Sequence, residues 1–202
     1  MTKKQARKHI QVKVDEISAE LMWKVHNHLS DEKTDELVLQ FIACFEAYCG
    51  KIAEMQKNGN KNAISYIHFS WLRTNIIDKS YRLRIDAYDD NWYADRTECS
   101  GEYDASEIFS FLDDFAKMVD IERRGYVYAL SAADTKQIVM EESLKYNEIV
   151  TSLIQKALGQ AVYTSAFKSV LRGGQFSILV GEFHDASVMV YRQADGQEEV
   201  IS

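Results

Sequence analysis

Apolar residues recur at helical spacing along the first part of the chain. One stripe predicts a helix over residues 5–29: Ile10, Val14, Ile17, Leu21, Val25 and Leu29. Ser30 and Asp31 interrupt this stripe and can cap a new helix. A second stripe carries that helix to about residue 57: Val38, Phe41, Phe45, Tyr48, Ile52 and Met55. Because the connection is short, we predict that residues 1–58 form a helical hairpin.

The pattern changes from helical to extended after the turn residues 58–60. Residues 63–77 are rich in Ile, Tyr, Phe, Trp and Thr, which favours a two-sided strand, with an amphipathic helix as the alternative. Residues 81–88 alternate strictly, with Tyr81, Leu83, Ile85 and Ala87 on one face and Arg82, Arg84, Asp86 and Tyr88 on the other. A third strand, residues 91–99, is predicted to follow at once and close a hairpin.

Charge predicts how the second and third strands pair. If residues 89–90 form a two-residue loop, Arg84 faces Asp95 and Asp86 faces Tyr93. A slip by one residue would instead place Asp86 opposite Asp95. Because opposed like charges destabilise a sheet by about 0.2–1 kcal/mol, we predict the first register.

The rest of the chain adds helices and a second hairpin. Asp104 and Glu107 resemble a capping box, and a helix is predicted to follow and to end near residue 124. Its apolar residues recur at helical spacing: Ile108, Phe111, Leu112, Phe115, Met118 and Val119. Residues 126–130 are a short strand or a linker. Residues 131–172 predict one long helix, or two if Gly159 interrupts it. Residues 175–183 and 187–192 predict a β-hairpin, followed by a loose polar tail.

Runs of strands joined by tight turns, with helices before and after them, indicate the α+β class. We predict a single domain over residues 1–202, in which an antiparallel sheet packs with several helices. The sheet consists of a central three-stranded meander and the C-terminal hairpin at residues 175–193, and residues 63–124 form a β-β-β-α core. The predicted core side chains are Trp71, Leu83, Ile85, Phe111 and Phe115.

The chain is acidic, with 24 Lys and Arg residues against 31 Asp and Glu residues and a formal net charge of −7. This balance opposes binding to nucleic acid and to anionic membranes, both of which favour a basic surface. The sequence has neither a signal-peptide core nor an apolar run of membrane-spanning length. Cys44, Cys49 and Cys99 form no C-x-x-C motif and are typical of reduced thiols. We therefore predict a cytoplasmic protein.

Mixed charge and tyrosine on the polar face of the central hairpin predict a binding surface. Its residues are Arg82, Arg84, Asp86, Tyr88, Tyr93, Asp95 and Thr97. Tyr and Arg are enriched where proteins bind their partners, so the expected partner is a protein or a small molecule. The alternative is a solvated sheet face whose charges pair across strands.

An enzyme is the second hypothesis, and it has less support in the sequence. The chain contains no metal-binding motif, nucleophile elbow or phosphate loop, so we predict neither a metal site nor a cofactor. A hydrolase-like, metal-dependent site would have to be assembled from His68, Asp86, Glu98 and His184 in the folded chain. We therefore favour a non-enzymatic binding or accessory domain.

Broad apolar surfaces on two predicted helices favour self-association. The second helix carries Leu37, Ile42, Cys44 and Cys49 outside its main stripe, and the helix after Asp134 is similarly broad. A helix that packs on one neighbour needs only one apolar stripe, so the surplus predicts a homodimer. The alternative is that the helices cover each other within one chain.

Overall fold

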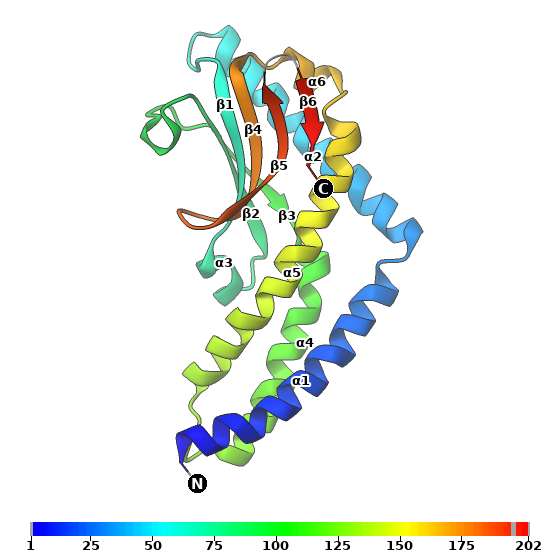
Figure 1. The fold of residues 1–202 in the computed structure, drawn as a ribbon, viewed down its shortest axis with the longest axis vertical. Helices are drawn as coiled ribbons and strands as arrows, with labels where there is room; N and C mark the ends of the chain where they lie inside the picture. The colour runs from blue at the N-terminus through cyan, green and yellow to red at the C-terminus, as the bar shows by residue number, and fades with distance from the viewer. Residues whose placement is uncertain (1, 195–196, 202) are drawn as a thin grey trace. The chain divides into compact units, whose positions relative to one another are not determined.

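Both helices and strands form the fold in the computed structural model, which describes residues 2–194 and 197–201 (Figure 1). The helices are α1 (Lys3–His28), α2 (Asp31–Lys57), α3 (Arg73–Ile77), α4 (Ser106–Arg123), α5 (Ala132–Ala161) and α6 (Ser165–Ser169), with short 3-10 turns η1 (Trp92–Ala94) and η2 (Arg124–Tyr126). The strands are β1 (Ile64–Trp71), β2 (Arg82–Tyr88), β3 (Ser100–Asp104), β4 (Arg172–Glu182), β5 (Ser187–Ala194) and β6 (Gln197–Val200). The predicted α+β class is confirmed.

The chain divides into two compact units, each built from separate stretches of sequence. Unit 1 contains Met1–Lys33, Arg73–Tyr81 and Ala105–Val150, and unit 2 contains Thr34–Leu72, Arg82–Asp104 and Thr151–Ser202. α2 and α5 each contribute residues to both units. The organisation of the whole chain as one domain, and the packing of α1 on α2 as a hairpin, stay predictions.

Unit 1 is helical, and its core lies between α1 and α4. The stripe predicted on α1 is buried from Ile10 to Val25. The buried face of α4 consists of Ile108, Phe109, Leu112, Phe115 and Val119. The prediction that Phe111 belongs to the core is wrong: it lies at the rim of this face, partly exposed, with its ring 5.4 Å from that of His28.

The connections around α4 and α5 differ in part from those predicted. The N-cap of α4 is Ala105, which makes no side-chain cap, and Glu107 forms an ion pair with Lys33 instead of closing a capping box. Ser131 and Asp134 do interact at the start of α5, where the Ser131 N–H and hydroxyl both donate to Asp134. Residues 124–129 form η2 and a turn instead of a strand.

The predicted helical region 131–172 contains two helices. α5 continues through Gly159, and the chain leaves the helix only after Ala161, before Thr164 caps α6. Gly159 is tolerated because a glycine costs only about 1 kcal/mol in a helix interior, which tertiary packing readily offsets. Within the described residues, no helix combines the length and the apolar character that crossing a membrane would require.

Unit 2 contains a six-stranded mixed sheet with the strand order β3-β2-β1-β4-β5-β6. The pairs β1–β2, β2–β3, β4–β5 and β5–β6 are antiparallel, whereas β1 and β4 are parallel. The predicted purely antiparallel sheet is therefore wrong at this one junction. A parallel pair needs a long connection, and residues 72–171 supply it. The polar tail, predicted to be loose, supplies β6, while residues 195–196 lie outside the described residues.

The central meander has its third strand later in the sequence than predicted. β1 ends at Trp71 and is followed by α3, and residues 89–99 form a loop around η1 instead of a strand. β3 pairs Glu102 with Arg84 and Ser100 with Asp86, so the predicted register that placed Arg84 opposite Asp95 is wrong. The rule of opposite charges still holds across these strands, because the new register places acidic Glu102 opposite Arg84.

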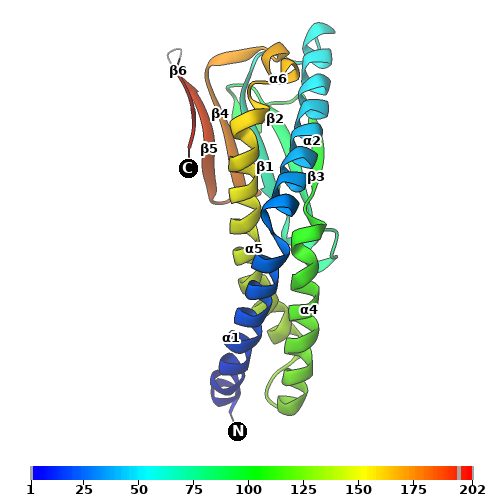
Figure 2. The ribbon, with the colours of Figure 1, turned by 90° about the vertical axis from the view of Figure 1, so that its right-hand side faces the viewer.

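Helices cover one face of the sheet in unit 2. The rings of Phe41 and Phe45 on α2 lie 5.4 and 6.2 Å from that of Phe69 on β1. Phe167 on α6 contacts Phe176 on β4 in the same layer. Figure 2 shows α2 and the last turns of α5 on this side of the strands. We call the opposite side of the sheet the outer face.

Candidate functional site

Polar residues of β1 and β2 meet at the centre of the outer face. His68 lies directly opposite Asp86, and Arg84 and Tyr88 project from the same side of β2 because strand side chains alternate. His68 is 0% exposed and Asp86 is 3% exposed, although the described helices of unit 2 lie on the other face (Figure 2). Their burial therefore depends on loops that cross the outer face.

Arg84 offsets the charge of Asp86. Its Nε donates to Asp86 Oδ2 at 2.6 Å and its Nη2 to Oδ1 at 2.9 Å, which is a bidentate pair. Nη2 also donates to Glu98 Oε1 at 2.9 Å. The hydrogen bonds to Asp86 raise the pKa of Arg84 above its usual range. One guanidinium thus lies between two carboxylates, and Glu98 remains largely exposed.

His68 is a neutral, fully buried histidine that binds two hydroxyl groups. Its Nε2 is 2.9 Å from Ser187 Oγ, and its Nδ1 is 3.4 Å from Tyr93 Oη. Burial lowers the pKa of His68 to about 4, against the opposing effect of the Asp86 charge. Gly181 permits the approach of Ser187, because a Cβ at that position would fall on the main chain of Ala186 and Ser187.

Six rings form a partly exposed layer over this polar centre, and we call them the aromatic face. They are Tyr66, Tyr88, Trp92, Tyr93, Phe183 and His184. Tyr66 and Trp92 meet edge to face with centroids 4.2 Å apart, and Tyr93 stacks on His184 at 4.1 Å. Trp92 and His184 have φ values of 55° and 59°, in the left-handed backbone region that residues other than glycine rarely adopt. Strained residues of this kind concentrate at functional sites.

A buried ion pair holds the loop that carries Trp92 and Tyr93. Lys61 Nζ is 2.5 Å from Asp95 Oδ2, with side chains 1% and 4% exposed, and it also donates to the Thr97 carbonyl. Asp95 accepts the N–H groups of Asp89 and Thr97. Burial alone would raise the pKa of Asp95, but Lys61 and these two N–H groups lower it overall.

The structure separates the residues predicted to form a binding surface into two sets. Arg84, Asp86, Tyr88 and Tyr93 gather on the outer face around His68. Arg82 lies at the start of β2, where it is exposed and forms an ion pair with Glu102, and Asp95 anchors the loop.

The residues proposed for an enzyme site also lie near one another without forming a single cluster. His68 and Asp86 are neighbours across strands, but Glu98 pairs with Arg84, and His184 stacks on Tyr93. Among residues 2–194 and 197–201, no three His, Cys, Asp or Glu side chains come together as a metal ion would require. Ser187 and His68 make the kind of contact that a hydroxyl nucleophile and its base would make.

A pocket of about 460 Å³ opens beside the aromatic face, where β1 and β4 begin. It is lined by Asn62, Ala63, Ser65, Tyr66, Asp89, Asp90, Gly173, Gly174 and Gln175. Between Ile64 and Tyr66 the pairing of β1 with β4 shifts, so that β4 advances five residues while β1 advances two. This bulge interrupts the strand pairing locally, and bulges are over-represented next to active sites.

Sequence reasoning missed Ser187, Lys61 and the pocket. Ser187 and Lys61 act through partners more than 30 positions away in the sequence, which no local pattern reveals. The pair Gly173–Gly174, which directly follows the predicted helical region 131–172, was a usable signal, although such a pair is also typical of a helix end. Glycines inside a strand also indicate a bulge or a close approach of the backbone.

Comparison with known proteins identifies no relative of this chain. No protein-family model matches the chain, and neither a curated protein nor a solved structure matches it significantly. The function must therefore be argued from the geometry of the outer face.

Proposed function

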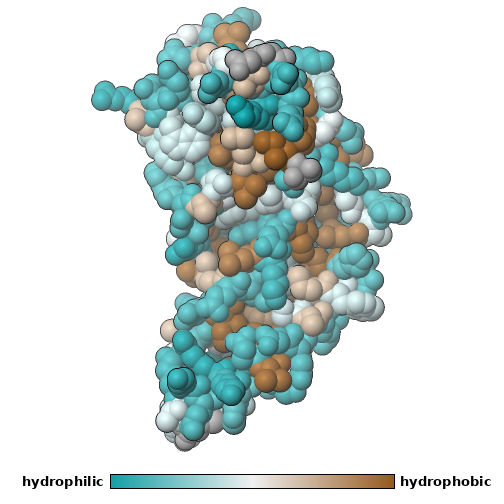
Figure 3. All heavy atoms as spheres, viewed as in Figure 1, coloured by the Kyte–Doolittle hydropathy of each residue, from teal (hydrophilic) through white to brown (hydrophobic). Residues whose placement is uncertain are grey.

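We propose that the chain is a non-enzymatic binding domain whose aromatic face recognises a peptide segment of a partner protein. The observation that carries this proposal is the aromatic layer itself, partly exposed on a sheet face that the described helices of unit 2 leave open. Figure 3 looks onto this side of the sheet and shows apolar side chains in small groups among hydrophilic ones. Tyrosine and tryptophan in such a mixed surface are the side chains that dominate binding energy at interfaces.

The face is held in one arrangement before any partner arrives. Asp86 with Arg84 fixes the polar centre, and Lys61 with Asp95 fixes the loop that carries Trp92. Prior ordering of this kind reduces the entropy that is lost on association, so a modest contact area can still give useful affinity.

Charge indicates which peptides fit. Glu98 and Asp90 are exposed beside the rings, and the chain carries a net charge of −7. Aromatic rings bind Lys and Arg side chains through cation–π contacts worth about 0.5–2 kcal/mol. We therefore expect the recognised segment to contain basic residues.

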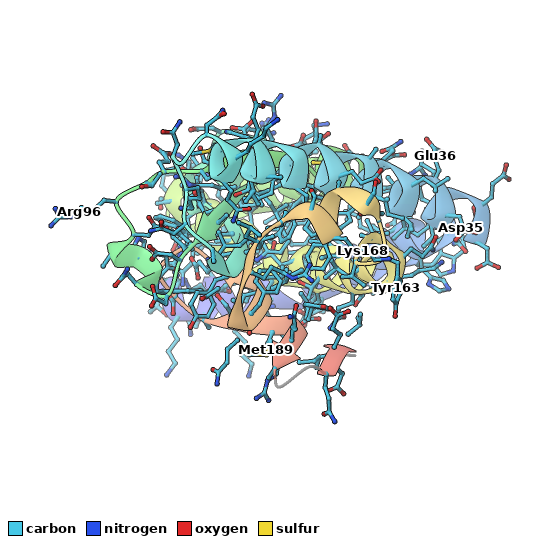
Figure 4. The ribbon with its side chains drawn as sticks, turned by 90° about the horizontal axis from the view of Figure 1, so that it is seen from above. Asp35, Glu36, Arg96, Tyr163, Lys168 and Met189 are labelled. Carbon is cyan, nitrogen blue, oxygen red and sulfur yellow. The ribbon has the colours of Figure 1, made fainter. Side chains whose placement is uncertain are left out.

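A peptide selection tests the proposal. Peptides enriched from a phage-displayed random library on the full chain are synthesised, and their affinity is measured by fluorescence anisotropy. Tyr93→Ala should weaken binding at least about tenfold, as the loss of an interface anchor does. Tyr163→Ala is the matched control, because Tyr163 is 66% exposed and lies beside Lys168, away from the aromatic face (Figure 4).

The controls separate lost recognition from lost folding. Thermal melts of each variant show whether Tyr93→Ala still folds, and Glu98→Lys provides a second change at a side chain that is 69% exposed. Equal affinity of wild type, Tyr93→Ala and Glu98→Lys for every selected peptide would overturn the proposal.

One observation favours an enzyme as the second candidate, namely the contact between Ser187 and His68. Two features weigh against it. A general base works best with a pKa near the working pH, whereas the pKa of His68 is about 4. Asp86, the acid that could orient His68, is bound by Arg84. Labelling of Ser187 by a fluorophosphonate probe, absent in Ser187→Ala, would support the enzyme, and a failure to label would remove it.

Location and assembly remain part of this proposal. We place the protein in the cytoplasm because Cys44, Cys49 and Cys99 are free thiols. Burial raises the pKa of Cys49 to about 12, so it is unreactive. The homodimer stays a prediction, although Leu37 and Cys49, part of the surplus that motivated it, are buried within the chain.

A further inference from the structure

We infer that the pocket beside the aromatic face binds an organic cation, an ammonium or guanidinium group held between Asp89, Asp90 and the ring of Tyr66. The inference deepens the proposed function and rests on it, because Tyr66 belongs to both the pocket and the aromatic face. The cation has two sources, the Lys or Arg side chain of a bound peptide and a free amine. The chemistry of recognition is the same for both.

Asp89 is a buried carboxylate with unused hydrogen-bonding capacity. It is 8% exposed, and its Oδ1 accepts the Asn91 N–H at 2.8 Å and the Asn91 Nδ2 at 3.1 Å. Oδ2 accepts no hydrogen bond from any residue that the structure describes. Asp89 lines the pocket, so an ammonium or guanidinium group there can donate to Oδ2 in a charge-assisted hydrogen bond.

The protein's own cations near the pocket are engaged elsewhere. Lys61 is bound to Asp95, and Arg172 lies over the ring of Phe167, with 4.2 Å from its guanidinium carbon to the ring centroid. Arg96, on the same loop as Asp90, extends away from the sheet (Figure 4). Neither Asp89 nor Asp90 forms an ion pair within the described part of the chain, so their charge is available to a ligand.

Tyr66 supplies the apolar wall that distinguishes an organic cation from a metal ion. Trp92 contacts its ring edge to face, which fixes the ring at the pocket. An ammonium or guanidinium group gains from an aromatic face as well as from carboxylates. A metal ion would need a closer set of oxygen or nitrogen ligands, and no such set was found among the described residues.

The bulge in β4 provides the space. Gly173 fits closely, since a Cβ there would lie 2.9 Å from Ser65 Oγ, and Gly174 leaves its side of the pocket open. The volume of about 460 Å³ lies within the range of small-ligand sites. The pocket also contains neutral side chains whose oxygens can accept hydrogen bonds from the N–H groups of the cation, namely Asn62, Ser65 and Gln175.

Amide NMR of the full-length chain tests the inference. The probes are putrescine, Nα-acetyl-lysine amide and 1,4-butanediol, the last of which matches putrescine in length without charge. Putrescine or the lysine amide should shift the amide signals of Asn62, Asp90 and Gly174, and butanediol should not. Asp89→Asn combined with Asp90→Asn should weaken cation binding at least about tenfold, equivalent to 1.4 kcal/mol. The matched control is Glu54→Gln, an exposed acid on α2.

The outcomes separate this inference from the proposed function. Binding by the lysine amide alone assigns the cation to a peptide, and binding by putrescine alone assigns it to a free amine; both support the pocket. Equal binding to the double variant, equal shifts with butanediol, or no shift with either cation would overturn it. If cations bind but no peptide depends on Tyr93, only the proposed function fails. If peptides depend on Tyr93 and cations do not bind, only this inference fails.

Discussion

Replacing Asp95 with alanine tests whether a buried ion pair holds the loop that presents Trp92 and Tyr93. The change would leave the Lys61 ammonium, whose side chain is 1% exposed, with only the Thr97 carbonyl at 2.6 Å. Removing one partner of a buried pair costs about 3–5 kcal/mol, because the remaining charge stays desolvated. The N–H groups of Asp89 and Thr97 would also lose the carboxylate that accepts their hydrogen bonds, which lowers the stability further.

Urea denaturation at pH 7, followed by circular dichroism, measures this loss. Glu102→Ala is the control, because it breaks a solvent-exposed ion pair with Arg82, and exposed pairs contribute little to stability. Lys61→Met combined with Asp95→Leu should recover part of the loss, since apolar side chains often replace a buried pair without penalty. A loss for Asp95→Ala no larger than that of the control would refute the reasoning.

The pH dependence of the same contact has a defined sign. The pKa of Asp95 is lowered in the folded chain, so its stabilising effect is present above its unfolded value of about 3.9 and is lost as pH falls through the folded value. The difference in stability between wild type and Asp95→Ala should therefore shrink on acidification. A difference that stays constant down to pH 2–3, about one unit or more below the unfolded value, would mean that the carboxylate charge is not what holds the loop.

Four further measurements address the core, the histidine and the partners. Phe115→Ala should cost about 3–5 kcal/mol in urea melts, whereas Phe111→Ala should cost clearly less because Phe111 is partly exposed; equal losses would contradict this. Because burial lowers the pKa of His68 from 6.5 to about 4, stability should rise with pH between these values, and His68→Gln should flatten the rise. Light scattering at about 23.2 kDa would refute the homodimer, and twice that mass would support it. Tight, salt-dependent retention of duplex DNA would refute the expectation, drawn from the net charge of −7, that the chain does not bind it.

Local patterns were sufficient to predict the first two long helices, α1 and α2. α1 and α2 end within a residue or two of the predicted limits, because the stripe of apolar residues and the Ser30–Asp31 interruption are contained in the sequence itself. The alternation over β2 was equally informative, since Leu83 and Ile85 are buried and Arg82 is exposed. In each case the periodicity of the side chains is the periodicity of the element.

The third strand was mispredicted because side-chain contacts distant in sequence decide it. Residues 91–99 contain Trp, Tyr and Thr, which favour a strand. In the structure Asp95 instead forms an ion pair with Lys61, and the chain turns through η1. The parallel pairing of β1 with β4 is equally invisible to local reasoning, because it joins two strands about 100 residues apart. Tertiary contacts of this kind regularly override strand propensity.

The candidate site was predicted in part for the same reason. Arg84, Asp86 and Tyr88 share one side of β2 by alternation alone, so they could be grouped from the sequence. Tyr93 joins them through the loop, and Ser187 joins them through the β4–β5 hairpin. Neither loop geometry follows from residue types, so the grouping of side chains on β2 was predictable from the sequence and the residues around it were not.

The burial of His68 connects the fold of the loop to the choice between binding and catalysis. The rings of Trp92 and Tyr93 contact His68 from the loop, and burial lowers the pKa of the histidine to about 4. A base that remains neutral at pH 7 and is shielded from solvent can position hydroxyl groups, but it is a weak acceptor of a proton in a reaction. The rings that cover it are at the same time the exposed part of the site. In our proposal the arrangement that preforms the outer face for binding is also the one that shields His68 from solvent. Asp95→Ala, which should release the loop, is therefore expected to weaken peptide binding and to expose His68 in the same variant.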